Sequence, residues 1–382
     1  MAEGEGMRMI ACLLGAALLA TSAVATPVTV TPVSTKPGAM LAVHSGGRVE
    51  RAPEGYKRQW PGTYFEAAFR GPSVLLRIGE GDVILRVSVD GVPVAKLVKP
   101  KPGLYRVAGL TNGRHTIRAD VASESQAAPT VFGGFYAGPG TRPLPVPART
   151  RQIEFIGDSH TVGYGNVSTK RDCTEAEVWA TTDAAQAMPA LTAKRYGADY
   201  QVNAISGRGI VRNYDGMAAD TLPVAYPFTL FDKVTPYVDP TWHPRLFVIA
   251  LGTNDFTTPL HPHEPWKTRE ALHADYEQHY VDFVKRLRAR NPDAHVVLWA
   301  TDMAGGEIAA EVSKVVTRLQ AEGQRNVAFV PVTGLAFTGC HSHPSTGDDA
   351  RIMTAVSGYI DAHPDIWTRK YPNDLHSVTA PR

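Results

Sequence analysis

The feature that most constrains this chain is a regular alternation of short apolar runs with amphipathic helical segments, which begins at Ile153. The apolar runs cover residues 153–156, 246–251, 296–299 and 327–332. Apolar residues recur at helical spacing after Thr268 and again from Ile308 to Leu319. Repeated strand-then-helix units are typical of right-handed crossovers and of a parallel sheet covered on both faces. The sequence therefore predicts a flavodoxin-like, three-layer α/β/α domain over residues 148–365.

A different pattern precedes it, and residues 26–147 predict a second domain. Apolar residues alternate with others at a period of two, the signature of half-buried strands, for example at Val83, Leu85, Val87 and Val89. The dipeptides Asp90–Gly91 and Asn112–Gly113 follow such runs and predict hairpin turns. Residues 40–137 have no long helical periodicity, so we expect a β-sandwich or jelly roll there. Residues 138–147 contain four prolines and predict the linker.

The two ends of the chain are expected to lie outside these domains. Arg8 precedes an apolar run over residues 9–20, and Ala23-Val24-Ala25 follows as a small-x-small cleavage pattern. Residues 1–25 are thus interpreted as a signal peptide, with an uncleaved anchor as the alternative. The mature protein would then be secreted or periplasmic, without a membrane segment. Residues 366–382 are expected to form a C-terminal tail.

Composition excludes several classes of protein. Hydrophobic residues make up 43% and charged residues 20% of the 382 residues, which rules out a wholly disordered chain. The 39 Lys and Arg nearly balance the 37 Asp and Glu, giving a formal charge of +2. A dedicated nucleic-acid binder normally has a basic excess, so no nucleic acid partner is expected.

Cysteine usage fits export. Cys12 lies in the predicted signal peptide, which leaves Cys173 and Cys340 in the mature chain. In an oxidising compartment two such cysteines indicate one disulfide, and two unpaired buried thiols are the alternative.

Four polar blocks follow the predicted strands of the second domain. They are Gly-Asp-Ser ending at Ser159, Ser-Gly-Arg-Gly at residues 206–209, Gly-Thr-Asn-Asp around Asn254, and Cys-His-Ser-His ending at His343. Sites in open parallel sheets gather at the carboxyl ends of the strands. A serine at a strand-to-helix turn exposes its hydroxyl, and glycine N–H and asparagine amide groups are good oxyanion donors. Together the blocks predict a hydrolytic site.

In this order the blocks resemble those of the SGNH (GDSL-like) hydrolase superfamily. The first two blocks, and the β domain placed before them, resemble carbohydrate esterase family 2 more closely. The β domain's Trp60-Pro61-Gly62, Phe69-Arg70-Gly71 and Val89-Asp90-Gly91 are also similar to that family's jelly roll. The resemblance implies removal of acetyl groups from plant-wall polysaccharides such as xylan or glucomannan, with an acetylated carbohydrate as partner and no metal or other cofactor.

Carried over position by position, the resemblance makes Ser159 the nucleophile and His343 the general base. The Ser159 N–H, the Gly207 N–H and the Asn254 side chain would form the oxyanion hole. Such a serine hydrolase would proceed through an acyl-enzyme.

One position departs from the superfamily pattern, which has Asp three residues before the histidine. Cys340 occupies that position. We therefore expect His343 to be oriented by a backbone carbonyl, in a Ser–His dyad, or by a distant Asp. Cys340 is expected to be tied to Cys173, which would link the nucleophile loop to the histidine loop.

Three other functions stay open at this point. The pairs His261-Pro262-His263-Glu264 and His341-Ser342-His343 fit a metal-dependent deacetylase, because close histidines plus a carboxylate can bind zinc. A non-catalytic carbohydrate-binding protein and a broader GDSL-type esterase or lipase are the others. Asp374-Leu375-His376 copies the missing Asp-x-x-His spacing loosely, but we expect His343 to be the base.

Overall fold

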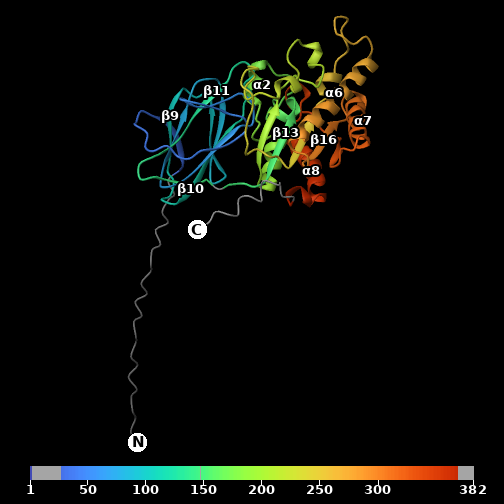
Figure 1. Ribbon diagram of the computed structural model, residues 1–382. Helices are drawn as coiled ribbons and strands as arrows, with labels where there is room; N and C mark the ends of the chain where they lie inside the picture. The colour runs from blue at the N-terminus through green and yellow to red at the C-terminus, as the bar shows by residue number, and fades with distance from the viewer. Residues whose placement is uncertain (2–26, 147, 369–382) are drawn as a thin grey trace.

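The computed structural model describes residue 1, residues 27–146 and residues 148–368. Two bodies lie side by side, an all-β body from the first half of the chain and an α/β body from the second (Figure 1). Within the described residues no helix combines the length and hydropathy needed to cross a membrane. The predicted signal peptide, apart from Met1, and Asp374 and His376 fall outside the described residues.

The first body is a sandwich of two antiparallel sheets. One sheet has the order β1 (Thr29–Val33), β9 (Gly103–Ala108), β6 (Val74–Ile78), β11 (Thr130–Ala137), β4 (Gly55–Arg58) and β3 (Glu50–Ala52). The other has the order β12 (Arg142–Leu144), β5 (Tyr64–Arg70), β10 (Arg114–Val121), β7 (Ile84–Val89) and β8 (Val92–Val98), with β2 (His44–Gly46) beside β5. The inward side chains form one apolar core, in which Phe65 stacks on Phe132 at 4.3 Å between ring centroids. The predicted β-sandwich is confirmed.

The two turn dipeptides have different outcomes. Asp90 and Gly91 have φ of 53° and 78° and join the paired strands β7 and β8, as a hairpin turn requires. Asn112–Gly113 lies between β9 and β10, which belong to different sheets, so the hairpin predicted there is wrong. A turn dipeptide favours a local reversal, but packing of the sandwich decides which strand the chain pairs with next.

The segment predicted as a linker, residues 138–147, is partly structured. Arg142–Leu144 forms β12, whose residues pair with Arg70, Phe69 and Ala68 of β5. The connection is therefore held against the sandwich before the chain enters the second body.

The second body contains a five-stranded parallel sheet with the order β14-β13-β15-β16-β17. In chain order this is 2-1-3-4-5, the flavodoxin-like arrangement, so that prediction is confirmed. The strands are β13 (Gln152–Gly157), β14 (Asp199–Ala204), β15 (Leu246–Ala250), β16 (His295–Thr301) and β17 (Val327–Val332).

Helices cover both faces of this sheet because its side chains alternate between two apolar cores. On β15, Phe247 and Ile249 face the core shared with α6 (Arg269–Arg290) and α7 (Glu307–Ala321). Leu246 and Val248 face the core shared with α3 (Met188–Tyr196) and α8 (Thr346–Ala362). The shorter helices are α1 (Ser159–Val162), α2 (Glu175–Thr181), α4 (Leu222–Ala225), α5 (Thr253–Phe256), η1 (Tyr214–Gly216), η2 (Ala304–Gly306), η3 (Cys340–Ser342) and η4 (Pro364–Trp367).

The two bodies are joined by a buried polar interface. Arg48 of the β body is 1% exposed, and its guanidinium contacts the Glu154 carboxylate at 3.3 Å and the Phe228 carbonyl at 3.2 Å. Trp60 donates its indole N–H to the same carbonyl at 3.1 Å, and the Tyr64 hydroxyl lies 2.6 Å from the Asp199 carboxylate. Buried charges need such partners, so these contacts fix the orientation of the two bodies.

Candidate active site

The four polar blocks meet at one edge of the parallel sheet. Ser159 starts α1 directly after β13, and Gly207 follows β14. Asn254 lies in α5 after β15, and His343 follows η3 in the connection between β17 and α8. Because all the strands run in the same direction, their carboxyl ends bring together residues that lie far apart in sequence.

Ser159 and His343 form a hydrogen-bonded pair. The distance between Ser159 Oγ and His343 Nε2 is 2.8 Å. Ser159 is fixed by a tight turn, since Asp158 caps α1 by accepting the His160 N–H at 3.0 Å and Gly163 ends the helix with φ of 81°. After His343, the side chain of Ser345 caps α8. Both side chains are therefore held by helix termini next to the sheet.

The other ring nitrogen of His343 faces two backbone carbonyls. Its Nδ1 lies 3.0 Å from the Cys340 oxygen and 3.3 Å from the His341 oxygen. Carbonyl oxygens only accept, so Nδ1 carries the proton and Nε2 is left to accept from the serine hydroxyl. No carboxylate hydrogen-bonds to His343 within the described residues, so of the two orienting groups expected it is the carbonyl that occurs.

The surroundings of His343 keep the imidazole neutral. Burial lowers the pKa of His343 to about 4, although the two carbonyls partly oppose this. The Tyr164 ring packs on it at 4.3 Å between centroids, and the His160 ring meets it edge-on at 5.5 Å. Burial also lowers the pKa of His160 to about 3, so this neighbour is neutral as well.

Two backbone N–H groups are suitable oxyanion donors. The N–H groups of Ser159 and Gly207 have no hydrogen-bond acceptor among the described residues. Gly207 has φ of 82°, a left-handed conformation that glycine adopts without strain. The Ser-Gly-Arg-Gly block supplies the glycine that this conformation favours.

Asn254, the third expected donor, already has acceptors. Its side chain is buried, and Nδ2 lies 2.9 Å from the Arg208 oxygen and 3.2 Å from the Asp158 carboxylate. An oxyanion would have to replace one of these contacts. Burial raises the pKa of Asp158 to about 7.

Asp255, which sequence reasoning missed, anchors the chain that follows the second block. Its carboxylate accepts the backbone N–H groups of Ile210, Val211 and Arg212 at 3.1, 3.0 and 2.9 Å. A Cβ on Gly209 would lie 2.4 Å from this carboxylate, so only glycine allows the close approach. The available signal was its position directly after Asn254, in the same block.

The β body also reaches this site, through two residues beyond β10 that sequence reasoning missed. Glu124 accepts the Ser206 N–H at 2.8 Å, and Gln126 donates its side-chain amide to the Ser206 oxygen at 3.2 Å. Burial raises the pKa of Glu124. Ser206 directly precedes Gly207, so the first domain holds the loop that carries one candidate oxyanion donor. No local pattern around Glu124 indicates this contact.

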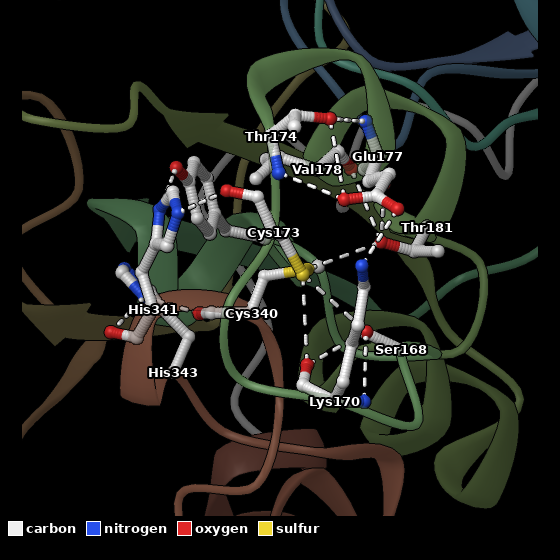
Figure 2. Close-up of a disulfide and its surroundings, with 12 residues drawn as sticks. Ser168, Lys170, Cys173, Thr174, Glu177, Val178, Thr181, Cys340, His341 and His343 are labelled. Atoms are coloured by element: carbon white, nitrogen blue, oxygen red, sulfur yellow. Dashed lines mark hydrogen bonds and ion pairs between the residues drawn. A yellow bond between two sulfur atoms is a disulfide. The ribbon is translucent and has the colours of Figure 1, made fainter.

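The predicted disulfide is confirmed: Cys173 and Cys340 are bonded, with their Cα atoms 5.5 Å apart (Figure 2). Cys340 is fully buried and is the first residue of η3. The bond therefore connects the segment after Ser159 to the turn before His343.

The histidines suggested as metal ligands have other partners. His261 lies 2.7 Å from Asp215, and the Glu264 carboxylate receives the buried Arg212 guanidinium at 2.9 Å. His341 has the Cys173 oxygen on one ring nitrogen and the Tyr164 hydroxyl on the other. In the described ranges no three His, Cys, Asp or Glu side chains are grouped so as to hold a metal.

A cavity of about 520 Å³ lies next to this site, where the two bodies meet. Its lining includes Tyr164 and Trp179 from the α/β body and the loop 124–129 from the β body. One face of Trp179 carries the Lys99 ammonium at 4.8 Å. Trp299, by contrast, is buried within β16.

Comparisons with known proteins agree with this architecture. The carbohydrate esterase 2 N-terminal model matches residues 45–147, and the GDSL-like lipase/acylhydrolase model matches residues 155–365. An acetylxylan esterase/glucomannan deacetylase of Cellvibrio japonicus is 44% identical over 339 residues, which cover 87% of this chain and 93% of that protein.

Solved structures give the same result. A carbohydrate esterase whose active site displays divergent catalytic and non-catalytic binding functions matches with a TM-score of 0.81 at 42% identity, over 86% of this chain and 100% of that one. A family two carbohydrate esterase from Clostridium thermocellum in complex with cellohexaose matches with a TM-score of 0.75 at 26% identity, over 85% of this chain and 100% of that one.

Proposed function

The chain belongs to the carbohydrate esterase 2 family, and on this basis we propose that it removes acetyl groups from plant-wall polysaccharides through Ser159 and His343. It is a carboxylic ester hydrolase, as its GDSL-like domain and its 44% identical relative establish. The observation that carries the proposal is the 2.8 Å contact between Ser159 Oγ and His343 Nε2 at the carboxyl edge of the sheet.

In the proposed reaction, His343 Nε2 takes the hydroxyl proton while Ser159 Oγ attacks the acetyl carbonyl. The N–H groups of Ser159 and Gly207 and the Asn254 amide stabilise the tetrahedral oxyanion. When this collapses, the imidazolium returns its proton to the departing sugar oxygen and leaves an acetyl-enzyme. Water, deprotonated by His343, then releases acetate and restores Ser159.

A dyad of this kind has no carboxylate to stabilise the imidazolium. The carbonyls of Cys340 and His341 supply partial negative charge to Nδ1–H instead. They also hold the tautomer in which Nε2 accepts a hydrogen bond. Fixing the tautomer and orientation of the histidine is part of what the third residue of a catalytic triad does.

We propose an acetylated polysaccharide as the substrate because the catalytic pair lies beside a cavity with aromatic walls. The catalytic pair lies beside the cavity between the two bodies, where Tyr164 and Trp179 offer aromatic surface to a sugar ring. The Cellvibrio japonicus relative is an acetylxylan esterase/glucomannan deacetylase. Export to the periplasm or the medium is part of the proposal, supported by the signal-like sequence and by the disulfide.

The decisive experiment is acetate release from acetylated xylan, acetylated glucomannan and acetylated monosaccharides, with Ser159→Ala as the blank. Nitrophenyl esters from acetate to octanoate should be hydrolysed more slowly as the chain lengthens, and a chelator should change nothing. A preference for octanoate would indicate a lipase. Sugar binding without acetate release would indicate a binding protein, and inhibition by the chelator would indicate a metal-dependent deacetylase.

The pH dependence should reflect the low pKa of His343. The imidazole must be neutral to take the serine proton, so kcat/KM is present above the His343 pKa and is lost as pH falls through it. We expect a plateau from mildly acidic to mildly alkaline pH and an acid limb near pH 4 rather than near 6.5. Initial rates between pH 3.5 and 9 measure this, and an acid limb between 6 and 7 would contradict it.

Replacing Asn254 with alanine should lower kcat by about 10²–10³-fold with little change in KM. The reason is that the amide stabilises charge that develops only in the transition state. Steady-state kinetics on acetylated xylan and on nitrophenyl acetate measure the effect, with the melting temperature as a check on folding. Thr257→Ala, just beyond α5, is the control and should retain activity. If Asn254→Ala kept full kcat, Asn254 would not belong to the oxyanion hole.

A further inference from the structure

The orientation of the proposed base depends on one short turn. The two carbonyls that face His343 Nδ1 belong to Cys340 and His341, both within η3. His341 and Ser342 have φ of 52° and 58°, so the turn holds two non-glycine residues in the left-handed region. Such a conformation persists only where surrounding contacts impose it. The direction of the imidazole is therefore set by whatever holds η3.

Backbone contacts hold η3 against the segment that follows the nucleophile. The Cys340 N–H donates to the Gly165 oxygen at 3.3 Å, and the His341 N–H donates to the Arg171 oxygen at 2.7 Å. Gly165 has φ of 55°, and a Cβ there would lie 2.4 Å from the Cys340 Cβ. The two segments therefore lie so close together that a side chain at position 165 would collide with Cys340.

Side chains complete this contact, and the disulfide is its covalent part (Figure 2). The His341 ring donates Nε2–H to the Cys173 oxygen at 2.7 Å and accepts the Tyr164 hydroxyl on Nδ1 at 3.0 Å. The face of Tyr164 in turn packs on His343. The disulfide, the His341 ring and Tyr164 therefore form one continuous set of contacts around the base.

We propose that the Cys173–Cys340 disulfide is a positioning element for His343, so that reducing it lowers turnover while the protein remains folded. The bond fixes Cys340, whose carbonyl accepts a hydrogen bond from His343 Nδ1–H, to the chain that follows Ser159. It thereby supplies covalently part of the orientation that a neighbouring carboxylate supplies elsewhere. This inference rests on the proposed role of His343 as the base.

Reduction is a balanced exchange with an added dithiol. The disulfide takes up two electrons and two protons and becomes two thiols, and the dithiol becomes its cyclic disulfide. Cys340 is buried and Cys173 is half-buried, so the reductant has access from the Cys173 side. The variant Cys173→Ser breaks the same bond without a reductant and keeps a small polar side chain at the more exposed position.

The test compares the oxidised protein, the dithiothreitol-reduced protein and Cys173→Ser at a temperature where circular dichroism shows all three folded. We expect kcat to fall by about 10- to 10²-fold with KM nearly unchanged, the scale of a small misplacement of a catalytic group. Dithiothreitol should have no further effect on Cys173→Ser, which controls for other actions of the reductant. His341→Ala keeps the disulfide but removes both ring contacts, and it should give a smaller loss in kcat.

The acid limb of kcat/KM provides a readout that loss of stability would not move. Hydrogen bonds to the carbonyls raise the pKa of His343, so weakening them should shift the acid limb to lower pH. Among the described residues, the ionisable groups that face this ring are His160, Tyr164 and His341. Burial keeps His160 neutral, while burial with the charges of Glu175 and Glu124 raises the pKa of Tyr164 to about 12.

Two results would overturn the inference. One is full kcat in the reduced, folded enzyme. The other is activity that falls only in proportion to the folded fraction, with an unmoved acid limb. Failure of the proposed function would give a different result. In that case the His343→Ala variant would retain activity, whether its disulfide is oxidised or reduced.

Discussion

Replacing Ser159 with alanine is expected to lower kcat for acetate release by about 10³-fold or more, with KM for acetylated xylan changed far less. The variant removes the protein atom proposed to bond to the acetyl carbon, but it leaves the backbone donors and the cavity in place. What remains should be the modest acceleration that oxyanion stabilisation and binding provide alone.

Acetate release under saturating substrate measures this effect, and mass spectrometry of the quenched wild type should show an added acetyl group that the variant lacks. Ser313→Ala, on α7, is the matched control and should retain wild-type activity. An unacetylated wild type with normal turnover, or an active Ser159→Ala, would exclude the acyl-enzyme route.

His343→Ala is expected to cost about the same, about 10³-fold or more in kcat, because His343 Nε2 is the group that hydrogen-bonds to the Ser159 hydroxyl. Groups that act as a unit give non-additive losses, so the double variant with Ser159→Ala should be no slower than either single variant. His261→Ala and His376→Ala are the controls and should retain most activity. If His376→Ala lost activity while His343→Ala kept it, the assignment of the fourth block would be wrong.

The arrangement of the α/β domain could be predicted from sequence because its signals are local. Four of the five strands are marked by short apolar runs, β14 (DYQVNA) being the exception, and the two long helices α6 and α7 show their own spacing, as Leu272 to Leu287 do in α6. The four blocks lie within a few residues of strand ends, and a parallel sheet necessarily gathers those ends at one edge. Bringing Ser159 and His343 together therefore needs only the strand order and no knowledge of side-chain packing.

The contacts between the two domains could not be predicted, because the sequence carries no comparable local pattern for them. Glu124 and Ser206 are 82 positions apart in sequence, and the charge of Glu124 is equally suited to an exposed loop. The pairing of β12 with β5 and the crossing of Asn112–Gly113 between sheets depend in the same way on packing of the completed sandwich. The carbonyls around His343 were expected only in general terms, since any residue can offer a carbonyl and its direction is a property of the folded turn.

The contact of Glu124 and Gln126 with Ser206 bears on how this protein can be divided and recombined. Domains joined only by a flexible linker, with few contacts between them, can be separated and recombined. Here the first domain holds the backbone next to an oxyanion donor, and Arg48 places a buried charge inside the second. A graft of residues 148–368 onto another scaffold would leave Glu154 without its cation and the Ser206 loop without its support. The unit that can be transplanted with its chemistry intact is therefore the pair of domains.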